Sequence, residues 1–401
     1  MVPEIYYLQI HLAQVSHEMD CLHEKVKNGL FENKKLIAYI STLNDIVAEI
    51  RKTDFASKSD NDKEQIRYIL LFMSVCVQYI KSATINDMKS AVYVCLRAAL
   101  EDWVKGNPLD YVVTTYKGNV GTHHYQPWTV DKQSIKAIYD IYSISFTDKL
   151  VSLAYPSYLE KDFLSNVSLY HELGHFIDLS EWDITARLTN FIIDNKCLQM
   201  QDVYFKNVDT TILFDKTNKL WPAEWNKLHR MLCEYFADIF AVQYIGRHKI
   251  HLSQYIAGDN GFDNEHPSTE ARTIAINNFL GPESNNDDFI KQLRWATNSI
   301  TGRPLKQRNI ALPKDDLLNN QPCSITDKHQ LHTLLQNAWE IWEASSKGNK
   351  MNPDLMSAYG RMNSLLEQSI MNYENNKKNH NESSGCESGD YAVVRYRHPL
   401  Q

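Results

Sequence analysis

The chain has 401 residues, of which 43% are hydrophobic and 23% charged, as in an ordinary globular protein. Its formal net charge of −7 gives no electrostatic basis for binding nucleic acid or an anionic membrane. We therefore expect no nucleic-acid partner and no insertion into a membrane.

The cellular compartment follows from what the sequence contains near its start and in its cysteines. The first residues lack the basic segment of a signal peptide, and the longest apolar run, residues 68–80, is too short to cross a bilayer. The seven cysteines show no Cys-x-x-Cys spacing, and several lie in apolar helical runs, which predicts reduced core thiols. We expect a cytoplasmic protein without a structural disulfide.

Residues 1–105 are predicted to form a helical N-terminal region. Apolar side chains recur at spacings of three and four over residues 66–80, and less regularly over residues 91–100. Ser59 opens a polar cluster of the kind that caps the start of a helix. The pattern indicates at least two amphipathic helices in this region.

Residues 106–160 have a mixed pattern. Residues 111–116 are β-prone and end at Lys117-Gly118-Asn119. Residues 141–146 and 150–155 are two β-prone runs on either side of a short polar turn, which predicts a β-hairpin.

The most informative motif is the pentapeptide His171-Glu172-Leu173-Gly174-His175. Two histidines four residues apart on a helix point the same way, so both rings can hold one Zn²⁺. Glu172 can then reach a water on the metal, whose pKa zinc lowers toward ~7. The alternative is a surface helix with two unrelated histidines, but the apolar stripe at Leu173, Phe176 and Ile177 favours a buried helix.

Gly174 is unusual inside a helix. Glycine costs about 1 kcal/mol of helix stability relative to alanine. We therefore expect a reason in close packing or in access to the metal.

A second helix is predicted over residues 228–242, which are almost uniformly apolar after Tyr235. Glu234 and Asp238 are four residues apart and share one face of it. Buried carboxylates are costly unless each has a partner, so we expect a metal for Glu234 and a histidine N–H for Asp238.

Four other residues compete for the place of third ligand. Asp178 and Asp183 follow the pentapeptide closely, but no His-x-x-Gly-x-x-His extends it. His229 is five residues from Glu234 and faces elsewhere, and Cys233 is rotated from it by about 100° on the helix. We favour Glu234, and we interpret Cys233 as a core thiol.

A third block, His266-Pro267-Ser268-Thr269-Glu270-Ala271-Arg272, follows the second helix. Pro267 favours the first turn of a helix, so a plain helix start is one interpretation. A structural ion pair between Glu270 and Arg272 is another.

Together, the pentapeptide and the downstream Glu-x-x-Ala-Asp resemble the gluzincin class of zinc metallopeptidases, and the third block is similar to the His-Pro-x-x-x-x-Arg signature of the CAAX prenyl protease and heat-shock metallopeptidase family. The resemblance covers residues 165–280. The chain differs from that family in lacking membrane-spanning segments and in the sequence between the ligand helices.

The resemblance implies roles and a fold. His171, His175 and Glu234 would be the zinc ligands, Asp238 would support His171, and Glu172 would be the general base. His266 and Arg272, with Tyr235 behind them, are the candidates for a hydrogen-bond donor that faces Glu172. We also expect a strand just before the metal helix to form the sheet edge that binds the substrate backbone.

The expected architecture is α+β and predominantly helical, with a zincin-like core in residues 106–300 and a small sheet beside the metal helix. A helical C-terminal region, residues 301–375, and a flexible linker and tail, residues 376–401, complete it. Residues 391–397 are β-prone, and either form a frayed terminus or dock on the sheet edge or in the cleft. We interpret His329 and His332 as a solvated helix face, and His123 and His124 as loop residues.

The sequence therefore predicts an intracellular zinc endopeptidase with a restricted, regulatory protein or peptide substrate, because long helical regions flank the catalytic core. The alternative is a catalytically silent protein that keeps zinc and acts as a binding or regulatory module. Glu172 favours catalysis, since a structural zinc site has no need of it. Activation by a regulatory protein partner stays open, as do Mn²⁺ and Co²⁺, although one carboxylate with two histidines suits zinc.

Overall fold

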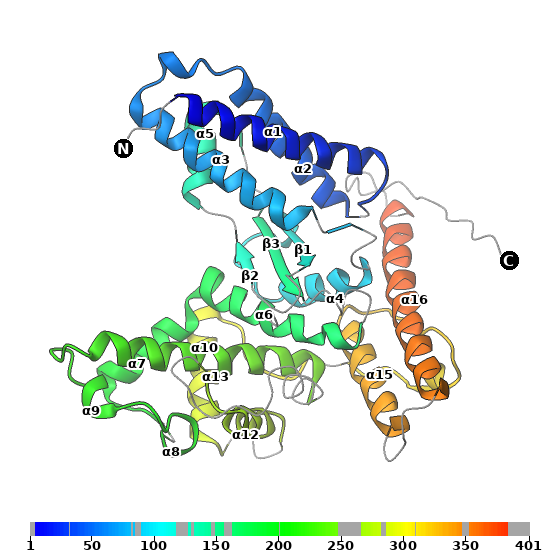
Figure 1. Cartoon of the computed structure of the whole chain (residues 1–401). Coiled ribbons are helices and arrows are strands. Elements are labelled where there is room, and N and C mark those ends of the chain that lie inside the picture. Colours follow the sequence, from blue (N-terminus) through cyan, green and yellow to red (C-terminus); the bar gives the residue numbers. More distant parts are fainter. Residues whose placement is uncertain are drawn as a thin grey trace.

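The fold is described by a computed structural model and is dominated by helices (Figure 1), which confirms the predominantly helical α+β class. The structure describes residues 5–31, 33–81, 83–84, 90–117, 127–129, 132–145, 149–155, 163–199, 201–247, 266–281, 286–308, 310–346 and 353–383. Within these residues, no helix combines the length and the apolar character needed to cross a membrane.

The helices before the metal motif are α1 (Ile5–Lys27), α2 (Lys34–Arg51), η1 (Phe55–Ser57), α3 (Asp60–Ile80), α4 (Ser90–Leu100), η2 (Pro108–Asp110), α5 (Lys132–Tyr142) and η4 (Ser165–Ser168). From the motif onward they are α6 (Leu169–Phe176), the π-helix η5 (Ile177–Trp182), α7 (Ile184–Asn195), α8 (Gln201–Tyr204), α9 (Thr210–Leu213), α10 (Trp221–Ile245), α12 (Thr269–Leu280), α13 (Asp288–Thr301), α14 (Asp315–Leu318), α15 (Gln330–Ser346) and α16 (Pro353–Ser383). The predicted cap at Ser59 is confirmed, because its side chain accepts a hydrogen bond from the Asp62 N–H at the start of α3.

Three strands, β1 (Tyr111–Lys117), β2 (Pro127–Thr129) and β3 (Lys149–Tyr155), form one sheet in the order β1-β3-β2. β1 and β3 run parallel along their whole length, whereas β2 is antiparallel to β3. Helix α6 packs against β2 and β3.

The predicted β-hairpin at 141–155 is wrong. Residues 132–142 form helix α5, in which Ala137 and Ile138 are buried, so Ile141 and Tyr142 end a helix. The strand over residues 149–155 pairs instead with β1, some 40 residues earlier in the chain. β3 therefore lies in the centre of the sheet, and the expectation that the strand before the metal helix is an edge is also wrong; among the described strands, β1 and β2 form the edges.

The sheet separates two hydrophobic cores, because neighbouring residues of a strand point to opposite faces. Val112 and Leu150 join the smaller core, which is built from α1, α2, α3 and α5. Tyr111, Val113 and Val151 join the larger core, which contains α4, α6, α10 and the C-terminal helices. Figure 1 shows the two groups of helices on opposite sides of the sheet. The expected boundary at residue 105 thus does not separate the cores, since α4 already belongs to the larger one.

The expected linker from residue 376 is helical at its beginning, because α16 continues to Ser383. The segment contains no glycine or proline between residues 373 and 383, so nothing in it interrupts the helix that α16 starts against the core. The β-prone tail at 391–397 and the pair His123 and His124 lie outside the described residues.

Candidate metal centre

Helix α6 carries the pentapeptide and lies directly on α10. Leu169, Leu173 and Phe176 anchor α6 in the larger core. At Gly174 a Cβ atom would stand 2.9 Å from the Ala237 Cα and 3.1 Å from the Phe240 Cβ of α10. Close packing is thus the reason for glycine at this position, and it brings the two predicted ligand helices to the distance that the site requires.

His171, His175 and Glu234 converge at this crossing. The Glu234 carboxylate lies 3.4 Å from His171 Nε2 and 3.3 Å from His175 Nε2, and the two ring nitrogens are 3.1 Å apart. One ligand atom of each residue lies within 4.8 Å of the others, and these three are the group that could hold a metal ion among the described residues.

The arrangement around His171 fits a metal. Its Nδ1 is 2.9 Å from Asp238 Oδ1, and because a carboxylate only accepts hydrogen bonds, Nδ1 carries the hydrogen. The lone pair of Nε2 is then directed toward Glu234 and His175, which is the tautomer that a metal ligand needs. Three electron-pair donors that converge in a buried place suit a cation, and the group could bind a metal ion.

The charged groups of the site change one another's pKa values. Burial by itself would raise the pKa of Glu234, but the Arg272 charge and the two neighbouring histidines outweigh it and hold this pKa well below its usual range. Burial would lower the pKa of His175, but its hydrogen bond with Glu234 raises it instead. Glu234 is therefore an anion in the folded protein at neutral pH.

Arg272 lies behind the ligands. Its Nε is 2.6 Å from Asp238 Oδ2 and its Nη2 is 2.9 Å from Asp238 Oδ1, which makes a two-point ion pair, and Nη2 is also 3.4 Å from Glu234 Oε2. Ser268 caps the helix that carries Arg272, α12, by accepting a hydrogen bond from the Ala271 N–H. The partner of Arg272 is therefore Asp238, and Glu270, the partner considered from the sequence, is exposed.

The other candidates for catalysis lie in different settings. Glu172 is buried next to His171, and its charge contributes to the raised pKa of His175. His266 has an exposed side chain and precedes the helix cap, so a plain helix start describes the His266-Pro267 segment as the structure has it. Tyr235 is fully buried and donates its hydroxyl hydrogen to the backbone carbonyl of Tyr204 at 2.8 Å.

The rivals of Glu234 have other partners. Asp178 accepts hydrogen bonds from the Thr185 backbone N–H and hydroxyl, and Asp183 is in the left-handed region just before α7. His229 Nε2 lies 3.5 Å from Cys233 Sγ. Cys233 is the buried core thiol that we expected, and burial raises its pKa.

The interpretation of His332 as part of a solvated helix face is wrong. His332 is fully buried, its Nδ1 is 2.9 Å from the Tyr170 hydroxyl, and burial lowers its pKa to about 3. It connects α15 to the residue that precedes the first ligand. No local sequence signal marks this contact, because it joins segments 162 residues apart.

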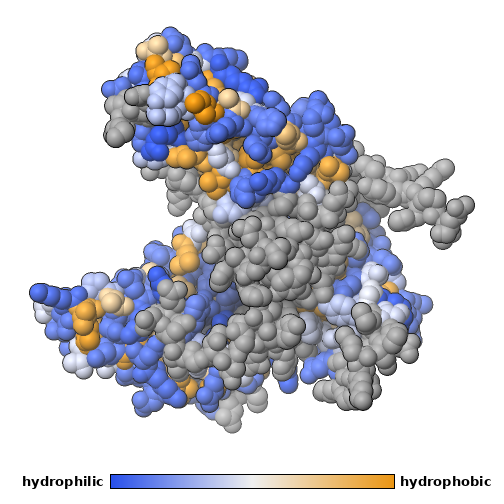
Figure 2. All heavy atoms as spheres, in the orientation of Figure 1, coloured by the Kyte–Doolittle hydropathy of each residue, from blue (hydrophilic) through white to orange (hydrophobic). Residues whose placement is uncertain are grey.

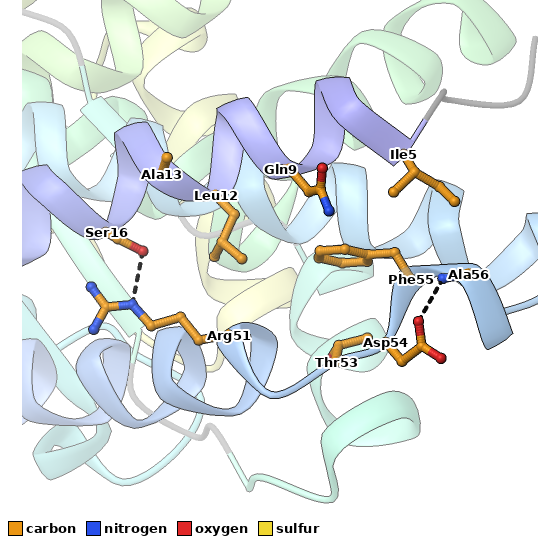
Figure 3. A pocket seen from close by; sticks show the side chains of 10 residues that line it. All are labelled: Ile5, Gln9, Leu12, Ala13, Ser16, Arg51, Thr53, Asp54, Phe55 and Ala56. Atoms are coloured by element: carbon orange, nitrogen blue, oxygen red, sulfur yellow. Dashed lines mark hydrogen bonds between the residues drawn. The ribbon is translucent and has the colours of Figure 1, made fainter.

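A hollow of about 440 Å³ lies elsewhere, between α1 and the end of α2 (Figure 3). Its wall includes Ile5, Leu12, Arg51 and Phe55, and the Arg51 Nε donates a hydrogen bond to Ser16 Oγ. These residues belong to or border the smaller core, so the hollow is separate from the metal group.

Comparisons with known proteins add no family. No model of a known protein family matches the chain. Searches of curated proteins and of solved structures also returned no match.

Proposed function

We propose that this protein is a zinc-dependent endopeptidase in which His171, His175 and Glu234 hold the metal. The observation that carries the proposal is the convergence of these three side chains beside a buried Glu172. Two imidazoles and one carboxylate form a donor set that catalytic zinc uses, and it leaves a position for water. Asp238 and Arg272 support the assignment, because ligand histidines usually donate their second N–H to a carboxylate.

Each side chain has a defined task in this reaction. When bound, zinc lowers the pKa of a coordinated water toward ~7 and polarises the substrate carbonyl. Glu172 accepts the proton of the attacking water and passes it to the leaving amine nitrogen. Asp238 keeps the hydrogen of His171 on Nδ1, and Arg272 holds Asp238 in the orientation that this requires.

The substrate is a protein or peptide with an extended segment. Of the two described sheet edges, β2 is the one against which α6 packs. A substrate strand that pairs with β2 would pass close to the metal helix. The helical regions on both sides of the core suit a restricted, regulatory substrate and an activating protein partner.

A cytoplasmic location belongs to the same proposal. The described cysteines, Cys21, Cys76, Cys95, Cys197, Cys233 and Cys323, are free thiols. Free thiols are usual in a reducing compartment.

The alternative, a silent zinc protein that acts as a binding module, is favoured by one observation. Two of the three candidate donors for the developing oxyanion are engaged elsewhere, Arg272 with Asp238 and Tyr235 with the Tyr204 carbonyl. The third, His266, is exposed. The two functions differ in whether purified protein cleaves peptide bonds.

The test combines metal analysis with mapping of new protein N-termini in a cell extract. Wild-type protein is expected to hold one zinc per chain and to create new N-termini, whereas Glu172→Gln keeps the zinc and loses cleavage by at least about 1,000-fold. His171→Ala is the matched control that loses both. Zinc without cleavage in the wild type supports the silent alternative, and a wild type without zinc contradicts both functions.

A further inference from the structure

The segment that leads into the metal helix is held by side chains of the C-terminal region. Asn363 of α16 accepts hydrogen bonds from the Phe163 N–H at 2.9 Å and from the Leu164 N–H at 3.4 Å. Trp339 of α15 donates its indole N–H to the Leu164 carbonyl at 3.0 Å. Two side chains that lie at least 175 residues further along the chain therefore fix the backbone of this segment.

These contacts have one direct effect on the fold. Phe163 and Leu164 are buried and lie outside the helices and strands, so the polar groups of their backbone need partners. Their position in the chain gives the contacts a second effect, because η4 and then α6 follow immediately. Whatever fixes residues 163 and 164 also fixes where the metal helix begins.

The start of α6 has little local support. The helix has 8 residues, and the first ligand, His171, is the third of them. Ser168 stands directly before α6, but its side chain makes no capping hydrogen bond, and its Oγ has no partner among the described residues. A helix this short is marginal by itself, so packing from other parts of the chain determines where its first turn lies.

The pair of helices α15 and α16 also contacts the two ligand helices directly. His332 of α15 lies 2.9 Å from the hydroxyl of Tyr170, the residue before His171. Gln336, one turn later on α15, donates a hydrogen bond to the Tyr244 carbonyl near the end of α10. The two helices pack against each other, so they act on α6 and α10 as one unit.

This pair turns its apolar side toward the metal half of the molecule. Leu334, Leu335, Leu365 and Leu366 belong to the larger core. Among the described residues, none of the exposed large hydrophobic side chains lies on α15 or α16. Figure 2 shows a largely hydrophilic surface at the lower right, where these two helices lie in Figure 1. The contacts of the pair are therefore directed inward, to the elements that carry the ligands.

We propose that Asn363 and Trp339 are positioning residues of the metal centre, which set the first turn of α6 and thereby the place of His171. This rests on the proposed function in one respect, namely that the three ligands hold a metal. Groups behind a metal ligand commonly change metal affinity by about 10- to 100-fold, and the effect here should be near the lower value because it is transmitted through the helix. The C-terminal helices then belong to the metal centre.

The test uses the full chain, prepared without metal and then given Zn²⁺ or Co²⁺ alone. Asn363→Leu and Trp339→Phe should each weaken zinc binding by about 10-fold, measured by competition with a chelator. They should also shift the visible absorption bands of the Co²⁺-loaded protein, which report the ligand geometry. Asn363→Asp should restore both properties, because a carboxylate still accepts hydrogen bonds from the two N–H groups.

Asn337→Leu is the control for a loss of stability. Asn337 is a buried asparagine on α15 that donates a hydrogen bond to the Leu312 carbonyl at 2.9 Å, away from the segment before α6. Its replacement removes the same kind of contact and should lower resistance to urea as Asn363→Leu does. We expect it to keep the zinc affinity and the Co²⁺ spectrum of the wild type.

Each outcome decides the proposal. Wild-type zinc affinity in both Asn363→Leu and Trp339→Phe overturns it, and so does an equal loss in Asn337→Leu, which would show an effect of stability alone. Weaker binding in the first two variants supports it even if the wild type cleaves no peptide, a result that would contradict only the peptidase. A wild type that binds no metal overturns both. Circular dichroism of the metal-free proteins shows that each variant is folded, and two independent substitutions protect the test from one that is not.

Discussion

At the scale of the residue, the centre depends on a chain of contacts that runs from Arg272 through Asp238 to His171. Arg272 reaches Asp238 at two points, and Asp238 is almost completely buried. A buried carboxylate without a partner is strongly destabilising, because its lost hydration is not replaced. The ion pair therefore stabilises the fold, and it also holds the Asp238 carboxylate in the position that orients His171.

Removing the guanidinium should expose this dependence. We expect Arg272→Met to lower the free energy of unfolding by about 3 kcal/mol, because the buried Asp238 charge then lacks its cationic partner. Arg272→Lys should have a free energy of unfolding between those of the wild type and Arg272→Met, because an ammonium keeps the charge but lacks the planar, two-point geometry of the guanidinium. Urea denaturation of the metal-free protein measures the effect. The double variant Arg272→Met/Asp238→Leu should recover most of the loss, and a single Met variant as stable as the wild type would contradict the role of Arg272.

The residues of the centre differ in how far the sequence could predict them. His171 and His175 were accessible because a spacing of four is a local property of a helix. Glu234 and Asp238 could be inferred together, since a buried helix must find partners for its acids. The partner of Arg272 could not, because its contact with Asp238 depends on the approach of α12 from 34 residues along the chain.

At the scale of the element, Gly174 fixes how closely α6 approaches α10. An added Cβ would meet the backbone of Ala237, which cannot rotate away. We expect Gly174→Ala to destabilise the fold by about 1 to 3 kcal/mol in spite of the better helix propensity, and to lower zinc occupancy, because the helices must separate.

Gly360 provides the control for this substitution. It lies within α16, and a Cβ there would meet nothing within 4 Å. Gly360→Ala should therefore stabilise the protein by up to about 1 kcal/mol through helix propensity alone. Thermal unfolding and metal analysis of both variants compare the two sites, and equal effects would show that packing against α10 is unimportant.

The contact between α15 and α6 should produce a pH dependence. The pKa of His332 is about 3 in the folded protein, whereas an unfolded histidine has a pKa near 6.5. A lowered folded pKa means that the unfolded chain binds the proton more readily, so this histidine reduces stability as pH falls below about 6.5. The loss is about 1.4 kcal/mol per pH unit, or about 2 kcal/mol between pH 6.5 and 5.

His332→Gln should flatten this part of the profile. The amide oxygen can still accept a hydrogen bond from the Tyr170 hydroxyl, but it does not titrate. Urea denaturation of wild type and variant at several pH values between 5 and 7 gives the difference in slope. Parallel profiles over this range would contradict the assignment of a low folded pKa to His332.

The strands show why pairing is harder to predict than the presence of a strand. The β-prone residues 111–116 and 150–155 were found, since β-branched and aromatic side chains favour a strand locally. Their partnership was missed because parallel pairing requires a crossover, and the segment between them contains α5 and β2. The predicted hairpin failed for a different reason: Ile141 and Tyr142 have β propensity, but they end helix α5, whose Ile138 packs in the smaller core, and such packing outweighs local propensity.

At the scale of the whole molecule, one sheet belongs to two cores. Val112 and Leu150 face the α1–α3 side, and Val113 and Val151 face the metal side. The sequence indicated helical regions on both sides of a mixed segment. It could not show that the strands of this segment contribute to both hydrophobic cores, because that depends on which strands pair and on which face of the sheet alternate residues lie. We therefore expect the shared sheet to couple the stability of the N-terminal helices to that of the metal centre.

This coupling predicts that both sides unfold together and respond together to zinc. None of the eight tryptophans lies in α1, α2, α3 or α5, so their fluorescence reports on the sheet and the metal side, whereas far-ultraviolet circular dichroism also reports on α1 to α3. We expect coincident urea transitions by the two methods, and zinc at about 1,000 times its dissociation constant should raise the free energy of unfolding by about 4 kcal/mol in both. If the helical signal is lost in two steps, and only the second follows the fluorescence and shifts with zinc, the N-terminal helices unfold independently and the shared sheet does not couple them to the metal site.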